Sequence, residues 1–325
     1  MGMIRAFTFG NGRLKEVENP LAALDTLVWI DLVSPTPEEE AHLAHRLGVT
    51  IPAKDELHEI EESNRLYTED NMTVMTAVLP SGVSKGSPMM APVAFILSNG
   101  RLITVRYHKP KSIEGFSAWA EKIGLDCAAG ETALVGMLEV IINREADILE
   151  ECSRQIDGVY NTIFEDDMAS DSASRDFKSL LFRLGRAGDL ASKVRDSLVT
   201  LDRMVTFLYQ IVVARKGGSE KRARLKTILR DIDSLSAHSD SLAQKVTFLL
   251  DATLGLVNIE QNSIIKIFSV VAVIFMPPTL VASIYGMNFV SMPELHFAFG
   301  YPMAVVMMFI SALMPYLLFK RKGWL

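Results

Sequence analysis

The chain has 325 residues, a formal net charge of −6, 49% hydrophobic residues and 22% charged residues. This length suits about two domains and a sizeable buried core, and with this acidic balance we expect no nucleic-acid partner. The two cysteines, Cys127 and Cys152, are isolated in the sequence, which fits buried thiols in a reducing cytosol better than a disulfide or a metal site.

Residues 1–128 have the pattern of a cytoplasmic α/β domain. Short strand-like runs occur at TLVWIDL, MTVMTAVL, VAFILS and LITVRY, and they alternate with helical pieces. One of these pieces, TPEEEAHLAHRLG, has Thr36 as a candidate N-cap and Pro37 in its first turn. The N-terminal stretch lacks a basic start followed by a long apolar core, so we expect no signal peptide.

Residues 129–220 predict two long amphipathic helices that pair antiparallel and are separated by the acidic turn EDDMASDSAS. After the helix breaker KGGSE, residues 221–265 predict a stalk helix that continues into the next apolar segment. We therefore expect one unbroken helix that runs from the cytoplasm into a membrane. About 60 residues at 1.5 Å each would span roughly 90 Å.

Two apolar runs near the C-terminal end predict transmembrane helices. No charged residue occurs between Lys266 and Glu294, or from residue 297 to residue 319, and a bilayer needs only about 20 helical residues. We assign a first span to residues 266–285, an external loop to 286–296, a second span to 297–319 and a basic tail to 320–325. Lysine and arginine flank only the outer ends of this pair, so we expect both termini in the cytoplasm and the chain in the inner (plasma) membrane. A pair of buried helices in a soluble protein is the alternative, and the adjacency of the two runs argues against it.

One face of the predicted stalk and first span carries small, polar or moderately apolar side chains at steps of three and four residues. This stripe consists of Asn262, Ile265, Ser269, Ala272, Met276, Thr279 and Ser283. Small and hydroxyl residues also let membrane helices pack closely, which is the alternative explanation. Asn258 and Asp251 extend the stripe inward and favour a water-bearing channel. Because two spans cannot enclose a pore, this interpretation requires an oligomer with the first span inside and the second outside.

The connector between the two runs reads YGMNF at residues 285–289, followed by MPEL at residues 292–295. With the preceding NIEQNSIIKIF and the closing FKRKGWL, this motif resembles the C-terminal signature of the CorA family of divalent-cation transporters, in particular its proteobacterial type. The resemblance implies an α+β membrane protein with a cytoplasmic α/β domain, a long helical stalk and two C-terminal transmembrane helices per chain. It further implies a funnel-shaped homopentamer in membrane lipid, whose central pore is lined by the first span. Mg²⁺ would be the main cargo, with Co²⁺ and Ni²⁺ also carried down the electrochemical gradient.

The same motif predicts a selectivity filter at Gly286, Met287 and Asn288. Mg²⁺ holds its waters tightly and prefers octahedral oxygen coordination, so neutral oxygens that grip the hydrated ion would allow fast release. Asn288 would offer its amide carbonyl to the water shell, Gly286 would let the backbone turn its carbonyl toward the axis, and Met287 would pack. Glu294, the only formal negative charge of the loop, is a candidate for attracting cations, and a solvated charge without a role is the alternative.

Apolar constrictions that close by dewetting are candidates for a gate. The residues available for them are Ile265, Met276 and either Phe268, which the family resemblance favours, or Ser269, which the periodic stripe favours.

Asp251 is a candidate regulatory metal site, roughly 15 Å inward of Asn262 at 1.5 Å per residue. Five like charges repel one another, and intracellular Mg²⁺ that bridges neighbouring chains would favour a closed ring. The resemblance implies a partner carboxylate on the neighbouring α/β domain, for which Glu69 or Asp70 is available. An ordinary solvated stalk charge is the alternative. Mg²⁺ would thus be both cargo and regulatory ligand.

Two other functions remain open. The first is a zinc transporter of the related ZntB type, against which Met287 argues, because that branch often differs at the centre of the Gly-Met-Asn motif. The second is a membrane-anchored sensory coiled coil without transport, against which the loop motif argues. No phosphate-binding glycine loop or nucleophile motif is present, so we expect no enzymatic activity.

Overall fold

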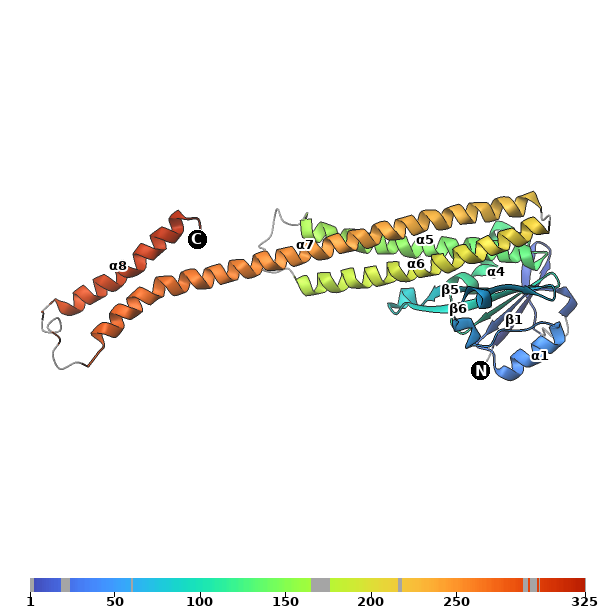
Figure 1. Cartoon of the computed structure of the whole chain (residues 1–325), viewed down its shortest axis with the longest axis horizontal. Helices are drawn as coiled ribbons and strands as arrows, with labels where there is room; N and C mark the ends of the chain where they lie inside the picture. Colours follow the sequence, from blue (N-terminus) through green and yellow to red (C-terminus); the bar gives the residue numbers. More distant parts are fainter. Residues whose placement is uncertain are drawn as a thin grey trace. The chain divides into compact units, whose positions relative to one another are not determined.

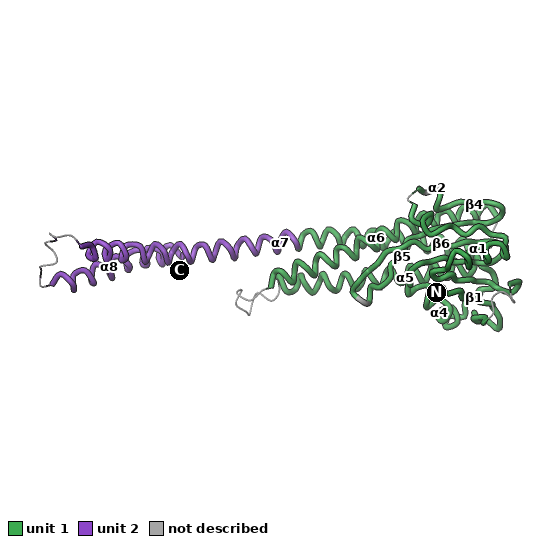
Figure 2. Tube along the Cα trace, turned by 90° about the horizontal axis from the view of Figure 1, so that it is seen from below, with its two compact units in different colours: residues 1–249 green, residues 250–325 purple. Residues whose placement is uncertain are grey.

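The computed structural model describes residues 3–18, 24–59, 61–164, 176–215, 218–288 and 299–324, together with residues 292 and 297. The chain divides into two compact units, Met1–Leu249 and Leu250–Leu325, which Figure 2 colours separately. The first unit holds a β-sheet and most of the helices. The second contains the distal part of the longest helix and one further helix.

The first unit is built on a seven-stranded mixed sheet with the order β2-β1-β3-β7-β6-β5-β4. Its strands are β1 (Met3–Gly10), β2 (Arg13–Glu16), β3 (Leu27–Val33), β4 (Leu66–Glu69), β5 (Met72–Ser81), β6 (Met89–Ser98) and β7 (Arg101–Arg106). Of the described neighbouring pairs, β3 and β7 run parallel and the others antiparallel. The four strand-like runs of the sequence form the contiguous centre β3-β7-β6-β5. The predicted mixed α and β fold, with long helices and two C-terminal apolar helices, is confirmed.

Successive residues of a strand point to opposite faces of the sheet. The central strands have apolar side chains on both faces, and helices cover both. Ile30 packs on one face in a cluster with Leu43 of α1 (Pro37–Leu47). The adjacent Trp29 points to the other face, where its ring lies edge-on to Phe116 of α4 (Phe116–Ile123), with 5.5 Å between ring centroids. Two shorter helices, α2 (Glu62–Arg65) and α3 (Lys111–Glu114), complete this part.

Helix α1 begins where the sequence predicts. Thr36 is its N-cap: the Thr36 hydroxyl accepts a hydrogen bond from the backbone N–H of Glu39, and the Glu39 carboxylate accepts one from the Thr36 N–H. Such a reciprocal cap satisfies two N–H groups that lack partners within the helix. The helix ends at Gly48, whose φ of 63° is readily adopted only by a residue without a Cβ.

A buried ion pair joins the two parallel strands. The Arg106 guanidinium donates to both oxygens of Asp31, at 3.0 and 2.8 Å, and to the carbonyl of His108 at 2.7 Å. Thr104 donates to the same carboxylate at 2.8 Å, and His108 Nε2 lies 3.0 Å from the Leu79 carbonyl. Burial lowers the pKa of His108 to about 4, so its ring is neutral at physiological pH. Because both charges are fully paired, loss of either partner would leave an uncompensated buried charge.

Two long helices, α5 (Gly130–Phe164) and α6 (Phe177–Ala214), pack on the sheet, and the first part of a third, α7 (Ser219–Tyr285), runs along these two helices (Figure 1). Helices α5 and α6 run antiparallel, and the first part of α7 runs parallel to α5. Arg224 of α7 pairs with Glu139 at 2.8 Å, Lys245 pairs with Asp157, and Phe248 stacks on Phe164 at 6.1 Å between centroids. The first part of α7 therefore packs against α5, and α5, α6 and this part of α7 form one three-helix bundle.

The second unit contains the rest of α7 and α8 (Gly300–Arg321), which runs back along it (Figures 1 and 2). Helix α7 extends over 67 residues, and Pro277 and Pro278 lie inside it. At 1.5 Å per residue its length is about 100 Å. Its bounds include both the predicted stalk residues and the first apolar segment.

Candidate functional site

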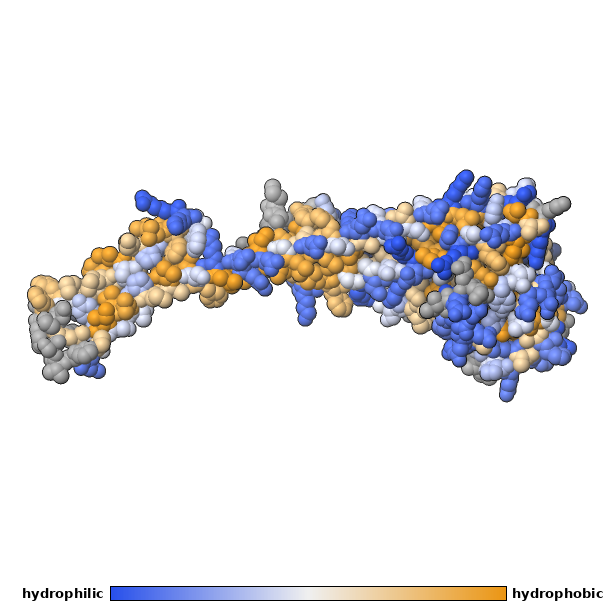
Figure 3. Space-filling model, viewed as in Figure 1, coloured by the Kyte–Doolittle hydropathy of each residue, from blue (hydrophilic) through white to orange (hydrophobic). Residues whose placement is uncertain are grey.

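Three helices of the described chain are long and apolar enough to cross a membrane: α6, α7 and α8. In α6, 39% of the most apolar window is buried, because this helix packs on α5 and on β5. The corresponding share is 6% in both α7 and α8, whose apolar side chains cover much of the second unit (Figure 3). Burial therefore separates α6, a helix of the first unit's core, from the two C-terminal candidates.

The stripe residues predicted on α7 are exposed, and they lie on the side of the helix that faces away from α8. Val270 of α7 and Ala304 of α8 are 2% and 6% exposed, whereas the neighbouring residues of both helices are largely exposed. With about 100° of rotation per residue, Lys266 and Ile274 share the side of Val270, and both are half-buried. The stripe lies on the opposite side of α7, and all its members are exposed: Asn262, Ile265, Ser269, Ala272, Met276, Thr279 and Ser283. Phe268 is exposed on this side as well, so it remains an alternative to Ser269.

The stripe presents oxygen atoms as acceptors. The Ser269 hydroxyl donates to the carbonyl of Ile265 at 2.8 Å, and the Thr279 hydroxyl donates to the carbonyl of Phe275 at 2.7 Å. With each hydroxyl hydrogen used within the helix, the oxygen lone pairs remain for an outside donor. Water bound to a cation turns its hydrogens outward, so such a surface suits a hydrated cation.

The candidate filter begins where α7 ends. Gly286 donates its N–H to the carbonyl of Ala282 at 2.9 Å, and Met287 donates to the carbonyl of Ile284 at 3.3 Å. Gly286 does not have a positive φ; a Cβ there would lie 3.0 Å from the Ala282 oxygen, so close approach is what favours glycine. Asn288 follows as an exposed residue. The three candidates thus form a turn that leaves the amide of Asn288 accessible.

The remaining described candidates belong to other elements than this turn. Glu294 falls outside the described residues. Asp251 is exposed on α7, at the start of the second unit. Glu69 and Asp70 are exposed at the end of β4 in the first unit, where Asp70 has a φ of 43° in a tight turn.

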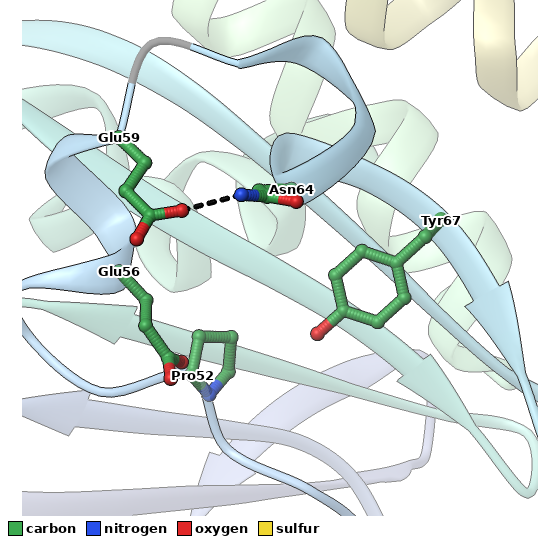
Figure 4. Close-up of a pocket in the computed structure, with 5 residues that line it drawn as sticks. All are labelled: Pro52, Glu56, Glu59, Asn64 and Tyr67. Carbon is green, nitrogen blue, oxygen red and sulfur yellow. Dashed lines mark hydrogen bonds between the residues drawn. The ribbon is translucent and has the colours of Figure 1, made fainter.

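The first unit has an acidic pocket of about 450 Å³, shown in Figure 4. Its lining consists of Pro52, Glu56, Glu59, Asn64 and Tyr67. The Asn64 amide donates to Glu59, and Glu56 accepts from the backbone N–H of Ala53 at 2.9 Å, so both carboxylates already have partners. Within the described residues, no group of three or more His, Cys, Asp or Glu side chains is arranged to hold a metal ion. The pocket itself is lined by two carboxylates, Glu56 and Glu59.

Sequence reasoning missed a buried carboxyl group on α5. Glu145 is 1% exposed, and its Oε1 lies 2.9 Å from the Ser197 hydroxyl of α6. That hydroxyl also lies 2.7 Å from the carbonyl of Val78 in β5. Burial raises the pKa of Glu145 to about 8. The pattern of α5 alone could not reveal this group, because its partner is 52 positions away.

Comparisons with known proteins agree with one another. The family described as CorA-like Mg2+ transporter protein matches residues 25–321. The chain is 37% identical over 329 aligned residues to the magnesium transport protein CorA of Haemophilus influenzae, which covers 99% of this chain and 100% of that protein. The CorA magnesium transporter structure from Methanocaldococcus jannaschii has a TM-score of 0.68 at 18% identity, over 99% of each chain. A ZntB cytoplasmic domain from Vibrio parahaemolyticus gives a TM-score of 0.55 at 11% identity, over 79% of this chain and 99% of that domain.

Proposed function

Because this chain belongs to the family of CorA-like Mg²⁺ transporter proteins, we propose that it carries Mg²⁺ into the cell through a pore formed by several copies. One observation carries the mechanism: the exposed stripe, with the hydroxyl oxygens of Ser269 and Thr279 as acceptors, lies on the side of α7 opposite α8, and α7 ends just before the exposed Asn288. The family consists of ion transporters, and we propose no enzymatic activity.

The proposed assembly is a homopentamer with α7 around the axis and α8 outside. Residues 266–285 and 297–319 would span the membrane, and residues 286–296 would form the external loop. Both termini would lie in the cytoplasm, which the cations Lys266, Lys320 and Arg321 at the inner ends of the spans support. The burial of Val270 on α7 and of Ala304 on α8 supports the order of the two helices, because the stripe lies on the opposite side of α7.

The proposed filter binds a hydrated ion. Five Asn288 carbonyls would accept hydrogen bonds from the inner water shell of Mg²⁺, and the Thr279 and Ser269 oxygens would receive the ion further along. Neutral acceptors suit an ion that dehydrates reluctantly, since a ring of carboxylates would slow its release. Hydrated Co²⁺ and Ni²⁺ ions would pass through the same filter by the same hydrogen bonds to their water shells. The membrane potential supplies about 2.3 kcal/mol per charge per 100 mV, and about twice that for a divalent ion.

Regulation would use Asp251. In the pentamer, intracellular Mg²⁺ would bridge Asp251 of one chain to Glu69 or Asp70 of its neighbour and favour a closed ring. The exposure of all three carboxylates in the single chain supports this proposal, because each is accessible to another copy.

A zinc transporter of the ZntB type is the second candidate. It would use the same stripe and the same helix order, so the architecture does not discriminate between the two. Met287 at the centre of the filter motif and the full-length identity to a magnesium transport protein favour Mg²⁺. A sensory coiled coil would have no use for a row of acceptors facing away from α8.

The proposal is tested by ion flux into liposomes that contain the purified full-length chain. We expect Mg²⁺ uptake at an inside-negative potential, Co²⁺ and Ni²⁺ uptake in the same assay, and slower Zn²⁺ uptake. Flux of Zn²⁺ alone would support the second candidate, and no flux of any metal would overturn transport.

A further inference from the structure

The C-terminal end of α8 forms a cavity with an apolar floor and a cationic rim. Its volume is about 530 Å³, and its lining consists of Met314, Leu317, Leu318, Lys320 and Arg321. The three apolar side chains are 67%, 50% and 51% exposed, so the floor lies uncovered in the chain. Small-molecule sites have volumes of about 300–1,000 Å³, and this cavity falls within that range.

The rim cations have no counter-charge among the residues that the structure describes. Among the described residues, neither Lys320 nor Arg321 forms an ion pair. The carboxylates described in the second unit are Asp251 and Glu260, both on α7 before its apolar segment. The end of α8 therefore has an excess of positive charge beside apolar surface.

The residues after α8 fold back onto α7 and fix this end. Gly323 has a φ of 67°, and Trp324 donates its N–H to the carbonyl of Phe319 at 3.0 Å, which closes the helix end. The Trp324 ring stacks on Phe319, with centroids 5.5 Å apart, and Lys266 lies 5.6 Å from the centroid of the Trp324 ring. Lys266 also donates to the Gly323 carbonyl at 3.4 Å. Lys266 is thus engaged with the tail, while Lys320 and Arg321 remain available to a ligand.

We propose that this cavity binds an anionic phospholipid of the inner leaflet, and this inference rests on the membrane position in the proposed function. The phosphate would lie between Lys320 and Arg321, because a guanidinium matches two phosphate oxygens at once and an ammonium adds a point charge. The acyl chain would cover Met314, Leu317 and Leu318. A free phosphate would leave this floor exposed, so the apolar lining favours a lipid over a soluble anion. Basic pockets at the cytoplasmic side of transmembrane helices are suited to such headgroups.

The test is native mass spectrometry of the full-length assembly in detergent, titrated with phosphatidylglycerol or with phosphatidylcholine. We expect the assembly to retain phosphatidylglycerol preferentially. Lys320→Gln and Arg321→Gln should each weaken its binding about fivefold, and the double variant about thirtyfold, since each cation near an anionic surface contributes independently. Lys322→Gln is the matched control, because it removes one charge from the same tail without touching the cavity lining.

Three results would overturn the inference. They are equal retention of the two lipids, equal effects of Lys322→Gln and the two rim variants, and loss of bound lipid on addition of millimolar inorganic phosphate. The same spectra report the mass of the assembly, so a variant that fails to assemble is recognised and replaced by Arg321→Lys, which keeps the charge, loses the match to two phosphate oxygens and should weaken binding less than Arg321→Gln. The readout is independent of ion flux. Absence of lipid from an assembly that carries Mg²⁺ would therefore refute this inference alone, and lipid binding without flux would refute the proposed transport.

Discussion

Replacement of Glu145 by glutamine should change how the stability of the first unit depends on pH. The Ser197 hydroxyl has one hydrogen but lies within hydrogen-bond distance of two oxygens, the Val78 carbonyl and Glu145 Oε1. Both contacts are satisfied if Ser197 donates to Val78 and a protonated Glu145 donates to Ser197. Burial raises the pKa of Glu145 to about 8 and favours the same protonated form; the contact with Ser197 and the charge of Arg144 act in the opposite direction but have smaller effects. The amide of Glu145→Gln can donate to Ser197 in the same way at every pH.

The sign of the effect follows from proton binding. The ordinary pKa of glutamate is 4.5, and that of folded Glu145 is about 8. Between these values the folded chain binds more protons than the unfolded chain, so its stability falls as pH rises. The contribution is fully present below the ordinary pKa and is lost as pH passes through about 8. The slope is about 1.4 kcal/mol per pH unit at most, and glutamine removes it.

Thermal unfolding of the full-length chain in detergent, measured from pH 5.5 to 8, provides the assay. The unfolding temperature of Glu145→Gln should rise relative to that of the wild type as pH increases. Glu150→Gln is the control, since Glu150 is exposed on the same helix. Parallel pH curves for wild type and Glu145→Gln would refute the protonated state of this carboxyl group.

Two further predictions concern the second unit in the assembled state. Cysteines that replace Asn262 and Thr279, on the exposed stripe of α7, should cross-link between chains under mild oxidation. A cysteine that replaces Val306 of α8 should not. Cross-linking at Val306 alone would refute the proposed order of the helices. Asp251→Asn should weaken inhibition of uptake by internal Mg²⁺, because the variant loses the charge that the ion bridges. An inhibition curve that overlays the wild-type curve would remove Asp251 from regulation.

The sequence predicted those parts of the fold whose pattern is long or strongly apolar. The central strands stood out because they are nearly continuous apolar runs, and β3 is buried along its whole length. The strands β2 and β4 have four residues each and exposed positions, which is too short for an alternating pattern. The cap at Thr36 was predictable because it depends on Glu39, three residues away.

The stripe on α7 was predictable for a related reason: helical spacing alone places its residues on one face. Contacts between segments that are distant in the sequence could not be predicted in this way. The pairing of Glu145 with Ser197 and the fold-back of Trp324 onto Lys266 depend on tertiary packing that no local pattern encodes. The close approach at Gly286 was not predictable either: a Cβ there would lie 3.0 Å from the carbonyl oxygen of Ala282, a contact that only the folded turn creates.

Transport through the proposed filter depends on the side-chain carbonyl of Asn288, which Asn288→Ala removes. Mg²⁺ uptake should be measured in liposomes at an inside-negative potential for the wild type, for Asn288→Ala and for Met287→Leu, after gel filtration has shown that all three assemble alike. We expect Asn288→Ala to abolish uptake, because the carbonyl that accepts from the hydrated ion is gone, and Met287→Leu to retain most of it. Uptake by Asn288→Ala at the wild-type rate would show that Asn288 does not form the filter.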